Sequence, residues 1–376
     1  MKVAVVGLGY VGSNLAKAAK SVGYDVLGVE IDSKRLIELS DSDYLVTSDF
    51  SQVADASIVV IAVPTPLDSF RQPDLGPLLE ACGSVSGFIR PGVLIINEST
   101  SFPGTLRDLI APLFEEGVLL ASAPERIDPG NQTWNLMNTP RIVSGLSEEA
   151  TTRASEFYRA FCQSVIEVSS PEVAEAAKIF ENTFRQVNIA LVNEFAQIAE
   201  KLNISTFEVI DAAATKPYGF IPFFPSVGVG GHCIPVDPSY LSFAARKVGA
   251  PARFIELANE INLDMPKYIA ARIDQEYGVS GRQIQIAGIA YKPGVADVRE
   301  SPAISLIEAL RKKGGIVTWH DDFVEKNGDE NSLPISPVDI GVICTAHPGV
   351  NYDAWKSRTK VVDVSTTAGT LWKKFL

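Results

Sequence analysis

The chain has 376 residues, 46% of them hydrophobic and 21% charged, which predicts two or three globular domains and argues against disorder. Its formal net charge of −12 argues against nucleic acid as a partner, because a phosphate backbone is normally met by a basic surface. No apolar run reaches the roughly 18 residues of a membrane span and the start lacks a cleavage-site pattern, so we expect a cytoplasmic protein with no membrane partner.

The first thirty residues predict a dinucleotide-binding turn. "KVAVVGLG" is typical of a buried strand, Val11–Ser21 of a helix and "YDVLGVE" of a second strand. Gly7, Gly9 and Gly12 lie between the first strand and the helix, and Glu30 ends the second strand. Such glycines let a pyrophosphate approach the backbone at a helix N-terminus, and the acid accepts from a ribose hydroxyl and repels a 2′-phosphate. The pattern therefore favours NAD over NADP; the alternative is a turn that binds nothing.

Further strand patterns follow at "SIVVIAVP", "VLIINES", "GVLLASAP" and "PRIVSG", with helical segments between most of them. This alternation predicts a parallel sheet covered on both faces. We expect the first domain, an NAD-binding Rossmann domain, to span residues 1–168.

A long amphipathic helix is predicted next. Ser170 can cap it, Pro171 suits its first position, and apolar residues then recur every three or four positions over roughly thirty residues. A stripe of that length suits a connector between two domains or a dimer interface. Lys178 and Asn182 lie one turn apart beside it. We expect a central helical domain at residues 169–270.

The stretch "VGVGGHCIPVDP" places Cys233 after three glycines. Asp237 and Pro238 predict an N-cap and first residue of a following helix, whose N-terminus would stabilise a thiolate. We expect the glycines to leave room for a ligand. The alternatives are that Asp237 only caps its helix and that Cys233 only fills space. His232 is interpreted as structural rather than as a base, because adjacent side chains usually diverge.

The remaining cysteines are Cys82, Cys162 and Cys344, far apart in the sequence and without a C-x-x-C pair. Neither a disulfide framework nor a zinc site is indicated, and three histidines make a His-rich metal centre improbable. We therefore expect no metal.

The last hundred residues repeat the opening alternation. "QIQIAGIAY", "IVTWHDD", "DIGVICTAH" and "KVVDVS" predict strands, and Pro302–Lys313 predicts a helix. This second unit, expected at residues 271–376, lacks the glycine fingerprint, so a dinucleotide would not bind there in the usual way. The predicted fold class is α/β, with two doubly wound Rossmann-like domains joined by a long central helix.

A dinucleotide domain and a candidate thiolate together indicate a two-step oxidation. A thiolate can trap an aldehyde as a thiohemiacetal, which loses a second hydride to become a thioester that water cleaves. That route takes an alcohol to a carboxylate without releasing the aldehyde.

Seven motifs in order resemble the nucleotide-sugar 6-dehydrogenases of the UDP-glucose/GDP-mannose dehydrogenase family. They are "GLGYVG", "VPTPLD", "ESTSFPGT", "APERIDPGN", "EAAKIFENTFRQVNIALVNE", "GVGGHCIPVDP" and "GIAYKPGVADVRESPA". The resemblance implies an NAD-dependent enzyme with a UDP-sugar-binding C-terminal domain and a homodimer packed through the central helix.

Within that family the chain is most similar to the branch that oxidises UDP-N-acetylglucosamine. UDP-glucose enzymes usually carry a lysine where this chain has Val236 and a second glutamate where it has Pro129. UDP-N-acetylmannosamine enzymes usually lack the proline that matches Pro235. Oxidation of UDP-glucose or UDP-N-acetylmannosamine, a single-step dehydrogenase, and a nucleotide-sugar-binding protein without turnover remain as alternatives.

The resemblance also implies roles at matching positions. Cys233 would be the nucleophile, and Lys178 and Asn182 would stabilise the oxyanion that develops at the sugar C6. For Lys178 alone, a solvated helix face is the simpler interpretation.

Asp237 and Thr100 would hold the water that deprotonates the alcohol and later hydrolyses the thioester. Glu125 would take part in that hydrolysis or in general base work. Lys292 and Arg299 would contact the nucleotide-sugar or complete the site around the nicotinamide.

The implied binding residues form two groups. The cofactor group is Gly7, Gly9, Tyr10, Val11, Gly12, Glu30, Arg35, Thr65 and Arg299. The substrate group is Lys178, Asn182, Arg126, Phe220, Ser226, Gly230 and Lys292. One departure stands out: a glycine-, proline- and acid-rich insert usual in the family is reduced to "SDSDYLVT", which puts NAD affinity in doubt more than the chemistry.

Overall fold

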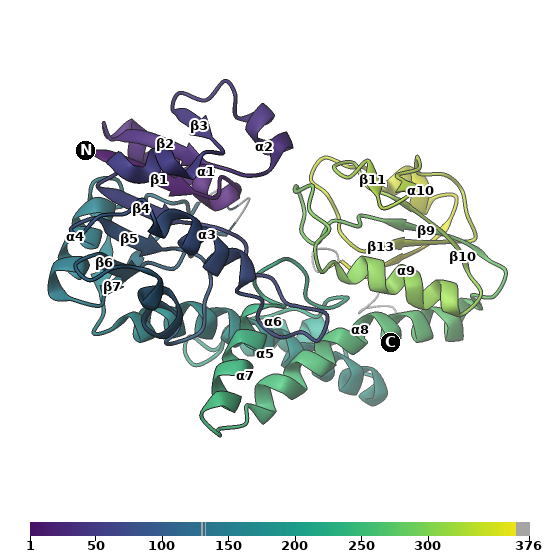
Figure 1. The fold of residues 1–376 in the computed structure, drawn as a ribbon. Helices are drawn as coiled ribbons and strands as arrows, with labels where there is room; N and C mark the ends of the chain where they lie inside the picture. Colours follow the sequence, from purple (N-terminus) through teal and green to yellow (C-terminus); the bar gives the residue numbers. More distant parts are fainter. Residues whose placement is uncertain (129–130, 132, 366–376) are drawn as a thin grey trace. The chain divides into compact units, whose positions relative to one another are not determined.

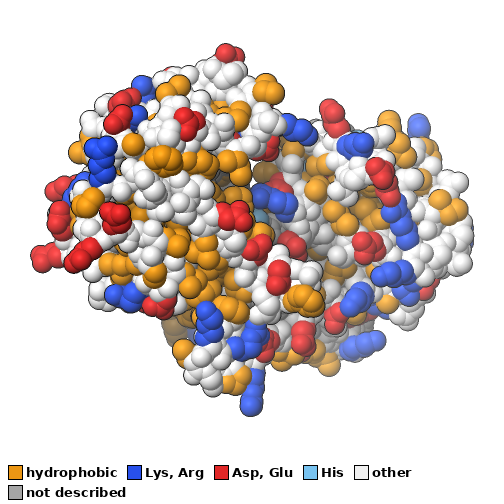
Figure 2. Space-filling view, viewed as in Figure 1, with side chains coloured by type: hydrophobic (Ala, Val, Ile, Leu, Met, Phe, Trp, Pro, Cys, Tyr) orange, Lys and Arg blue, Asp and Glu red, His pale blue; other side chains and the backbone are white. Residues whose placement is uncertain are grey.

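The structure, a computed structural model, describes residues 1–128, 131 and 133–365 (Figure 1). The chain forms two compact units: the first contains Met1–Glu181 with Ser239–Pro251, and the second Asn182–Pro238 with Ala252–Leu376. Within these described ranges, no helix is both long and apolar enough to cross a membrane. On the face shown in Figure 2, acidic and basic side chains are interspersed.

The first unit is built on a sheet whose eight described strands have the order β3-β2-β1-β4-β5-β6-β7-β8. They are β1 (Lys2–Val6), β2 (Asp25–Val29), β3 (Leu45–Thr47), β4 (Ile58–Ile61), β5 (Leu94–Asn97), β6 (Leu119–Ser122), β7 (Arg141–Gly145) and β8 (Val165–Glu167). The sheet is parallel except that β7 runs antiparallel to β6, so the all-parallel prediction is wrong there. A parallel pair needs a crossover element, and the described part of the connection from β6 to β7 forms turns and irregular structure.

Helices cover this sheet on faces set by the alternation of side chains along each strand. Leu15 of α1 and Phe157 of α4 belong to the same core cluster as Val3, Val5 and Val60, so both helices cover that face. The helical elements are α1 (Tyr10–Ser21), α2 (Ser33–Glu38), η1 (Phe50–Asp55), α3 (Gly76–Ser86), the π-helical turn η2 (Thr105–Ile110), η3 (Ala111–Leu113) and α4 (Glu148–Arg159).

The shortened segment "SDSDYLVT" is integrated into this unit. Tyr44 is buried, and the residues after it form the edge strand β3, which pairs with β2. The sequence did not predict β3. The segment thus closes one side of the sheet despite its length.

The helix α5 (Pro171–Leu202) runs for 32 residues, as predicted. Its residues Phe180, Leu191 and Leu202 expose 63%, 61% and 62% of their surface. An adjoining side of the helix is buried through Ile179 and Ala190. The predicted apolar stripe is therefore a surface feature of the single chain.

The second unit holds a four-stranded parallel sheet of order β10-β9-β13-β14. Helices α8 and α9 share its core through Ile269, Ile273, Leu306 and Leu310. Its elements are α6 (Thr206–Ala214), α8 (Arg253–Tyr277), β9 (Gln283–Ala287), α9 (Pro302–Lys312), β10 (Ile316–His320), β11 (Lys326–Asn327), β12 (Glu330–Asn331), β13 (Ile340–Ile343), α10 (Asp353–Lys356) and β14 (Lys360–Asp363). The fold is α/β with two doubly wound sheets, as the sequence predicts.

Candidate active site

The glycine turn between β1 and α1 has the geometry that a dinucleotide requires. Gly7 has φ +88°, and a Cβ there would lie 2.5 Å from the Ala62 carbonyl oxygen. A Cβ on Gly12 would lie 1.9 Å from the Gly7 carbonyl oxygen, so helix and strand pack too closely for a side chain. At Gly9, by contrast, a Cβ would meet open space among the described residues. This is the position at which the fingerprint brings a pyrophosphate against the backbone.

The N-terminus of α1 fits an anion. Tyr10 and Val11 begin the helix after Gly9, and within the described chain no side-chain hydrogen bond caps it and its first turn holds no acid. The N–H groups of a first helical turn lack partners inside the helix and carry its positive end. These residues fit the pyrophosphate of NAD.

Glu30 and Arg35 hydrogen-bond to the backbone of the glycine turn between β1 and α1. Glu30 Oε2 accepts from the Leu8 N–H at 2.9 Å, while Arg35 Nε donates to the Leu8 carbonyl at 2.9 Å. Arg35 Nη2 also donates to Ser13 Oγ at 3.0 Å. The carboxylate thus stands at the end of β2 beside the glycine turn, where its charge would repel a 2′-phosphate.

Thr65 and Thr100 lie on two loops that follow the neighbouring strands β4 and β5. Ser99 joins the loops, since its Oγ donates to the Val63 carbonyl at 2.8 Å and accepts from the Val63 N–H at 2.9 Å. The Thr65 carbonyl accepts from the Tyr240 hydroxyl at 3.0 Å. Tyr240 belongs to α7 (Asp237–Lys247).

Glu125 and Lys178 form an ion pair inside the first unit. Their Oε2 and Nζ atoms lie 3.9 Å apart, and their side chains are 11% and 6% exposed. The interpretation of Lys178 as a solvated helix position is therefore wrong, because this turn of α5 packs against the segment that follows β6. Arg126 is engaged by Glu181, at 2.6 Å, and by the Pro140 carbonyl, at 2.7 Å.

In the second unit, the glycines before Cys233 are enclosed by protein. A Cβ on Gly231, which has φ +89°, would lie 2.8 Å from the Tyr291 ring. A Cβ on Gly230 would lie 2.8 Å from Tyr291 Cβ and 2.9 Å from Pro302 Cδ. The expectation that these glycines leave room for a ligand is wrong, since Tyr291 and Pro302 fill that space.

Cys233 stands at the start of the turn that leads into α7. Its carbonyl accepts from the Asp237 N–H at 2.8 Å, and Asp237 Oδ2 accepts from Asn182 Nδ2 at 2.6 Å. Asp237 was predicted to be the N-cap that precedes the helix, but it is the first residue of α7 itself. Its side chain is buried. Asn182 therefore holds the carboxylate that follows the cysteine.

Exposure distinguishes Cys233 from the other cysteines. Cys82, Cys162 and Cys344 are buried, whereas Cys233 is half-buried. Burial raises the pKa of the Cys82 thiol to about 12 and also raises the pKa of the Cys162 and Cys344 thiols. Those three thiols are therefore suited to packing rather than to nucleophilic attack.

Arg299 lies beside the Cys233 turn. Its Nη2 donates to Asp297 Oδ2 at 2.6 Å, and its carbonyl accepts from the Gly231 N–H at 3.0 Å. The pKa of Arg299 is raised, first by the hydrogen bond to Asp297 and to a smaller degree by the charges of Asp297, Tyr291 and Cys233. A cation near the sulfur favours its thiolate form. Lys292 is half-buried in the loop after β9.

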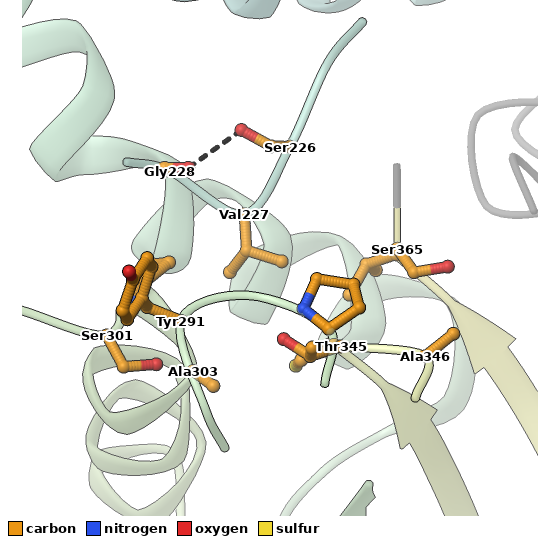
Figure 3. Close-up of a pocket in the computed structure, with 13 residues that line it drawn as sticks. Ser226, Val227, Gly228, Tyr291, Ser301, Ala303, Thr345, Ala346 and Ser365 are labelled. Carbon is orange, nitrogen blue, oxygen red and sulfur yellow. Dashed lines mark hydrogen bonds between the residues drawn. The ribbon is translucent and has the colours of Figure 1, made fainter. Parts of the chain in front are cut away.

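A pocket lies at the carboxyl ends of the second sheet, where the strand order reverses between β9 and β13 (Figure 3). Ser226 and Gly228 line it from the loop before Cys233, and the Ser226 N–H donates to Asn193 Oδ1 at 2.8 Å. The N-terminus of α9 also opens onto it through Ser301. Crevices at such switch points are where open α/β sheets bind ligands.

Sequence reasoning missed most of this pocket. Its further lining includes Tyr291, Thr345 and Ser365. Each lies in the C-terminal part of a predicted strand and follows the observed one, and that position was the available signal. Phe220, in the loop that precedes Ser226, exposes 39% of its surface. Pro129 lies outside the described residues.

The predicted site residues divide between the two units. The first unit holds Gly7, Gly9, Tyr10, Val11, Gly12, Glu30, Arg35, Thr65, Thr100, Glu125, Arg126 and Lys178. The second holds Asn182, Phe220, Ser226, Gly230, Cys233, Asp237, Lys292 and Arg299. The helix α5 carries Lys178 and Asn182 one turn apart.

Three domain families match the chain in order. They are the NAD binding, central and UDP binding domains of the UDP-glucose/GDP-mannose dehydrogenase family, over residues 38–162, 172–264 and 285–368.

Individual relatives match over most of their length. A UDP-N-acetyl-D-glucosamine 6-dehydrogenase of Salmonella typhi is 34% identical over 90% of this chain and 86% of its own. A UDP-N-acetyl-D-mannosamine dehydrogenase of Pyrococcus horikoshii is 35% identical over 95% of this chain and 92% of its own. A solved structure of the UDP-D-ManNAc dehydrogenase from Pyrococcus horikoshii superposes with a TM-score of 0.85 and 34% identity, covering 97% of this chain and 95% of that one. The chain therefore belongs to the UDP-glucose/GDP-mannose dehydrogenase family, as an NAD-dependent nucleotide-sugar dehydrogenase.

Proposed function

We propose that the protein oxidises the C6 hydroxymethyl group of UDP-N-acetylglucosamine to a carboxylate. One alcohol, two NAD⁺ and one water yield one uronic acid anion, two NADH and three protons. The observation that carries the proposal is the half-buried Cys233, held at the start of α7 beside the bonded pair Asn182 and Asp237.

The chain would hold NAD through the Gly7–Gly12 turn, the α1 N-terminus, Glu30 and Arg35. When bound, NAD accepts a hydride in each of the two oxidations. The Cys233 sulfur adds to the aldehyde carbon and forms a thiohemiacetal, which becomes a thioester after the second oxidation. Lys178 and Asn182 donate to the oxyanion at C6, and Arg299 favours the thiolate.

Thr100 and Asp237 hold the water that removes the alcohol proton and later attacks the thioester. That attack releases the thiolate of Cys233 and gives the carboxylate. Glu125 takes part in this proton transfer, and its ion pair with Lys178 at 3.9 Å supports a shared site for the two residues. Asp237 is oriented by Asn182, which restricts where its carboxylate can place a water.

The UDP group would bind the second unit. The pocket at the β9–β13 switch point, with the N-terminus of α9 at its edge, supports this placement, because such a terminus suits a diphosphate. Ser226 lines this pocket, and Lys292 and Phe220 would contribute from the surrounding loops. Arg126, in the first unit, is proposed separately as a substrate contact.

UDP-N-acetylmannosamine is the second candidate substrate, since relatives with either activity are about equally similar to this chain. The two sugars differ in configuration at C2. A pocket discriminates between such substrates by about 1–3 kcal/mol through a few contacts. Pro235 in the cysteine loop favours the N-acetylglucosamine branch over the N-acetylmannosamine branch, and Val236 argues against UDP-glucose.

The assembly and the domain division are also proposed. The exposed stripe of α5, with Phe180, Leu191 and Leu202, supports a homodimer through that helix. The divisions at residues 1–168, 169–270 and 271–376 correspond to the NAD-binding, central and UDP-sugar-binding functions. We place the reaction in the cytoplasm.

The decisive experiment counts NADH per sugar. Purified protein is given NAD and limiting UDP-N-acetylglucosamine, with UDP-N-acetylmannosamine and UDP-glucose in parallel. We expect two NADH for each UDP-N-acetylglucosamine consumed. Two NADH with one of the other UDP-sugars alone would show that the substrate is that sugar. One NADH per sugar would rule out the thioester step. Binding without NADH would support a protein that does not turn over.

The covalent step is tested by Cys233→Ser and Cys233→Ala, with the buried Cys82→Ala as a matched control. We expect Cys233→Ser to stall at the ester or aldehyde level and Cys82→Ala to keep turnover. Full two-step turnover in Cys233→Ala would overturn the mechanism.

A further inference from the structure

A buried carboxylate lies on α5 one turn before Lys178. Glu175 is 1% exposed. Its Oε2 accepts from the Gly104 N–H at 2.7 Å, and its Oε1 accepts from the Leu106 N–H at 2.9 Å and from Ser101 Oγ at 3.4 Å. Each carboxylate oxygen therefore has a backbone donor of its own.

These donors belong to the segment that directly follows Thr100. Gly104 adopts φ +96°, a conformation that side chains rarely allow, and Leu106 lies in the first turn of η2. Glu175 thus fixes the backbone of this segment to the same helix that carries Lys178. One side chain links the positions of Thr100 and Lys178.

Only a carboxylate satisfies this arrangement, because an ionised carboxyl group is an acceptor at both oxygens. A glutamine has one acceptor oxygen and would turn its amide N–H₂ toward one of the two backbone N–H groups. The substitution keeps the side chain's shape while it breaks one contact, which makes it a selective probe.

Arg107 of η2 is a cation that interacts with Glu175, since the pKa of Arg107 is raised first by the hydrogen bond and charge of Glu172 and to a smaller degree by the charge of Glu175. Glu172 lies one turn earlier on α5 and is bound to Arg107 of η2 at 2.7 Å. Asp108 lies beside Gly104, and Lys178 is paired with Glu125. Burial raises the pKa of Glu175 to about 7, although the hydrogen bonds from Leu106 and Gly104 oppose it.

We propose that Glu175 is a positioning residue for the oxidation, which clamps the segment 101–106 to α5 and so holds Thr100 at a fixed place relative to Lys178. The inference rests on the proposed function, in which Thr100 holds the water and Lys178 stabilises the oxyanion. Glu175 itself does not contact substrate.

The test compares Glu175→Gln with Glu172→Gln, which removes a surface ion pair to the same η2 segment. For Glu175→Gln we expect kcat to fall about 10- to 100-fold, because a displacement near 1 Å at a reacting group has such an effect. The KM for the UDP-sugar and the Kd for NAD should stay within about twofold. The control should keep kcat within about twofold.

The pH profile supplies a second readout. Wild-type kcat should fall as the pH drops through about 7, because a protonated Glu175 loses one acceptor, and Glu175→Gln should lack that limb. If Glu175→Gln keeps the kcat of the wild type and the same fall in kcat at acid pH, the proposal is overturned. If Glu175→Gln does not fold, Glu175→Asp keeps the charge, and an intermediate kcat is expected.

Amide hydrogen exchange separates this inference from the proposed function. At one fixed pH, the Gly104 and Leu106 amides should exchange faster in Glu175→Gln than in the wild type, whether or not the protein turns over any sugar. Unchanged exchange overturns the clamp. Faster exchange with an unchanged kcat overturns the positioning role of Glu175. If the wild type forms no NADH with any UDP-hexose, the proposed function is refuted, but the clamp is not.

Discussion

Replacing Arg141 with methionine should destabilise the first unit strongly. Arg141 on β7 forms an ion pair with Glu98, which follows β5, and the two side chains are 4% and 0% exposed. The hydroxyl of Tyr158 donates to the same Glu98 oxygen, and the Arg141 guanidinium carbon lies 4.6 Å from the centre of the Tyr158 ring. Burial raises the pKa of Tyr158, so this hydroxyl stays a donor.

The magnitude follows from the charge that would be left behind. Removing one partner of a buried ion pair costs about 3–5 kcal/mol, whereas replacing both partners with apolar residues is often close to neutral. Arg141→Met should therefore cost about 3–5 kcal/mol of unfolding free energy. The double variant Glu98→Leu/Arg141→Met leaves only the Tyr158 hydroxyl without its partner and should cost about 1–3 kcal/mol.

The measurement is urea unfolding combined with hydrogen exchange of amides in β5 and β7, which reports on the first unit alone. Arg159→Met is the control, because Arg159 and its partner Glu167 are 52% and 42% exposed. Such a surface pair contributes about 0–1 kcal/mol. A loss below about 1 kcal/mol in Arg141→Met, or a double variant less stable than the single one, would refute the reasoning.

Three further predictions concern other parts of the chain. Gly12→Ala should weaken NAD binding at least about tenfold in a fluorescence titration, because its Cβ would lie 1.9 Å from the Gly7 carbonyl oxygen; an unchanged Kd would contradict this. The pKa of Glu175 is raised by burial to about 7, above its unfolded value of 4.5, so its contribution to stability is full below about 4.5 and is lost as the pH rises through about 7. That loss amounts to about 3 kcal/mol, and a wild-type pH slope that persists in Glu175→Gln would show that another group causes it. Asp321→Asn should lower the stability of the second unit by about 1.5–3 kcal/mol in urea unfolding, because Asp321 Oδ2 accepts from buried His347 at 3.1 Å and from backbone N–H groups; no loss would contradict a structural role for this pair.

Local patterns in the sequence were sufficient for much of the fold. The glycine turn with Gly7 and Gly12, the 32-residue helix α5 and the strands of the second sheet were all predicted. Each depends on residues that are neighbours in the chain, so the period of the pattern and the backbone freedom of glycine determine it. The long helix α8 was not predicted, and Pro266 inside it works against a helical interpretation.

Contacts between distant residues could not be predicted in this way. The sequence alone allowed Lys178 to be solvated, but packing against the segment after β6 buries it beside Glu125. The glycines before Cys233 could equally have faced a ligand, but Tyr291 and Pro302 occupy that space. The clamp by Glu175 joins positions about seventy residues apart. The amino-acid sequence by itself determined most of the elements and the chemistry that their residue types allow. Only the tertiary structure decided which side chains lose water and which acquire a partner, because burial depends on all the segments that pack around a residue.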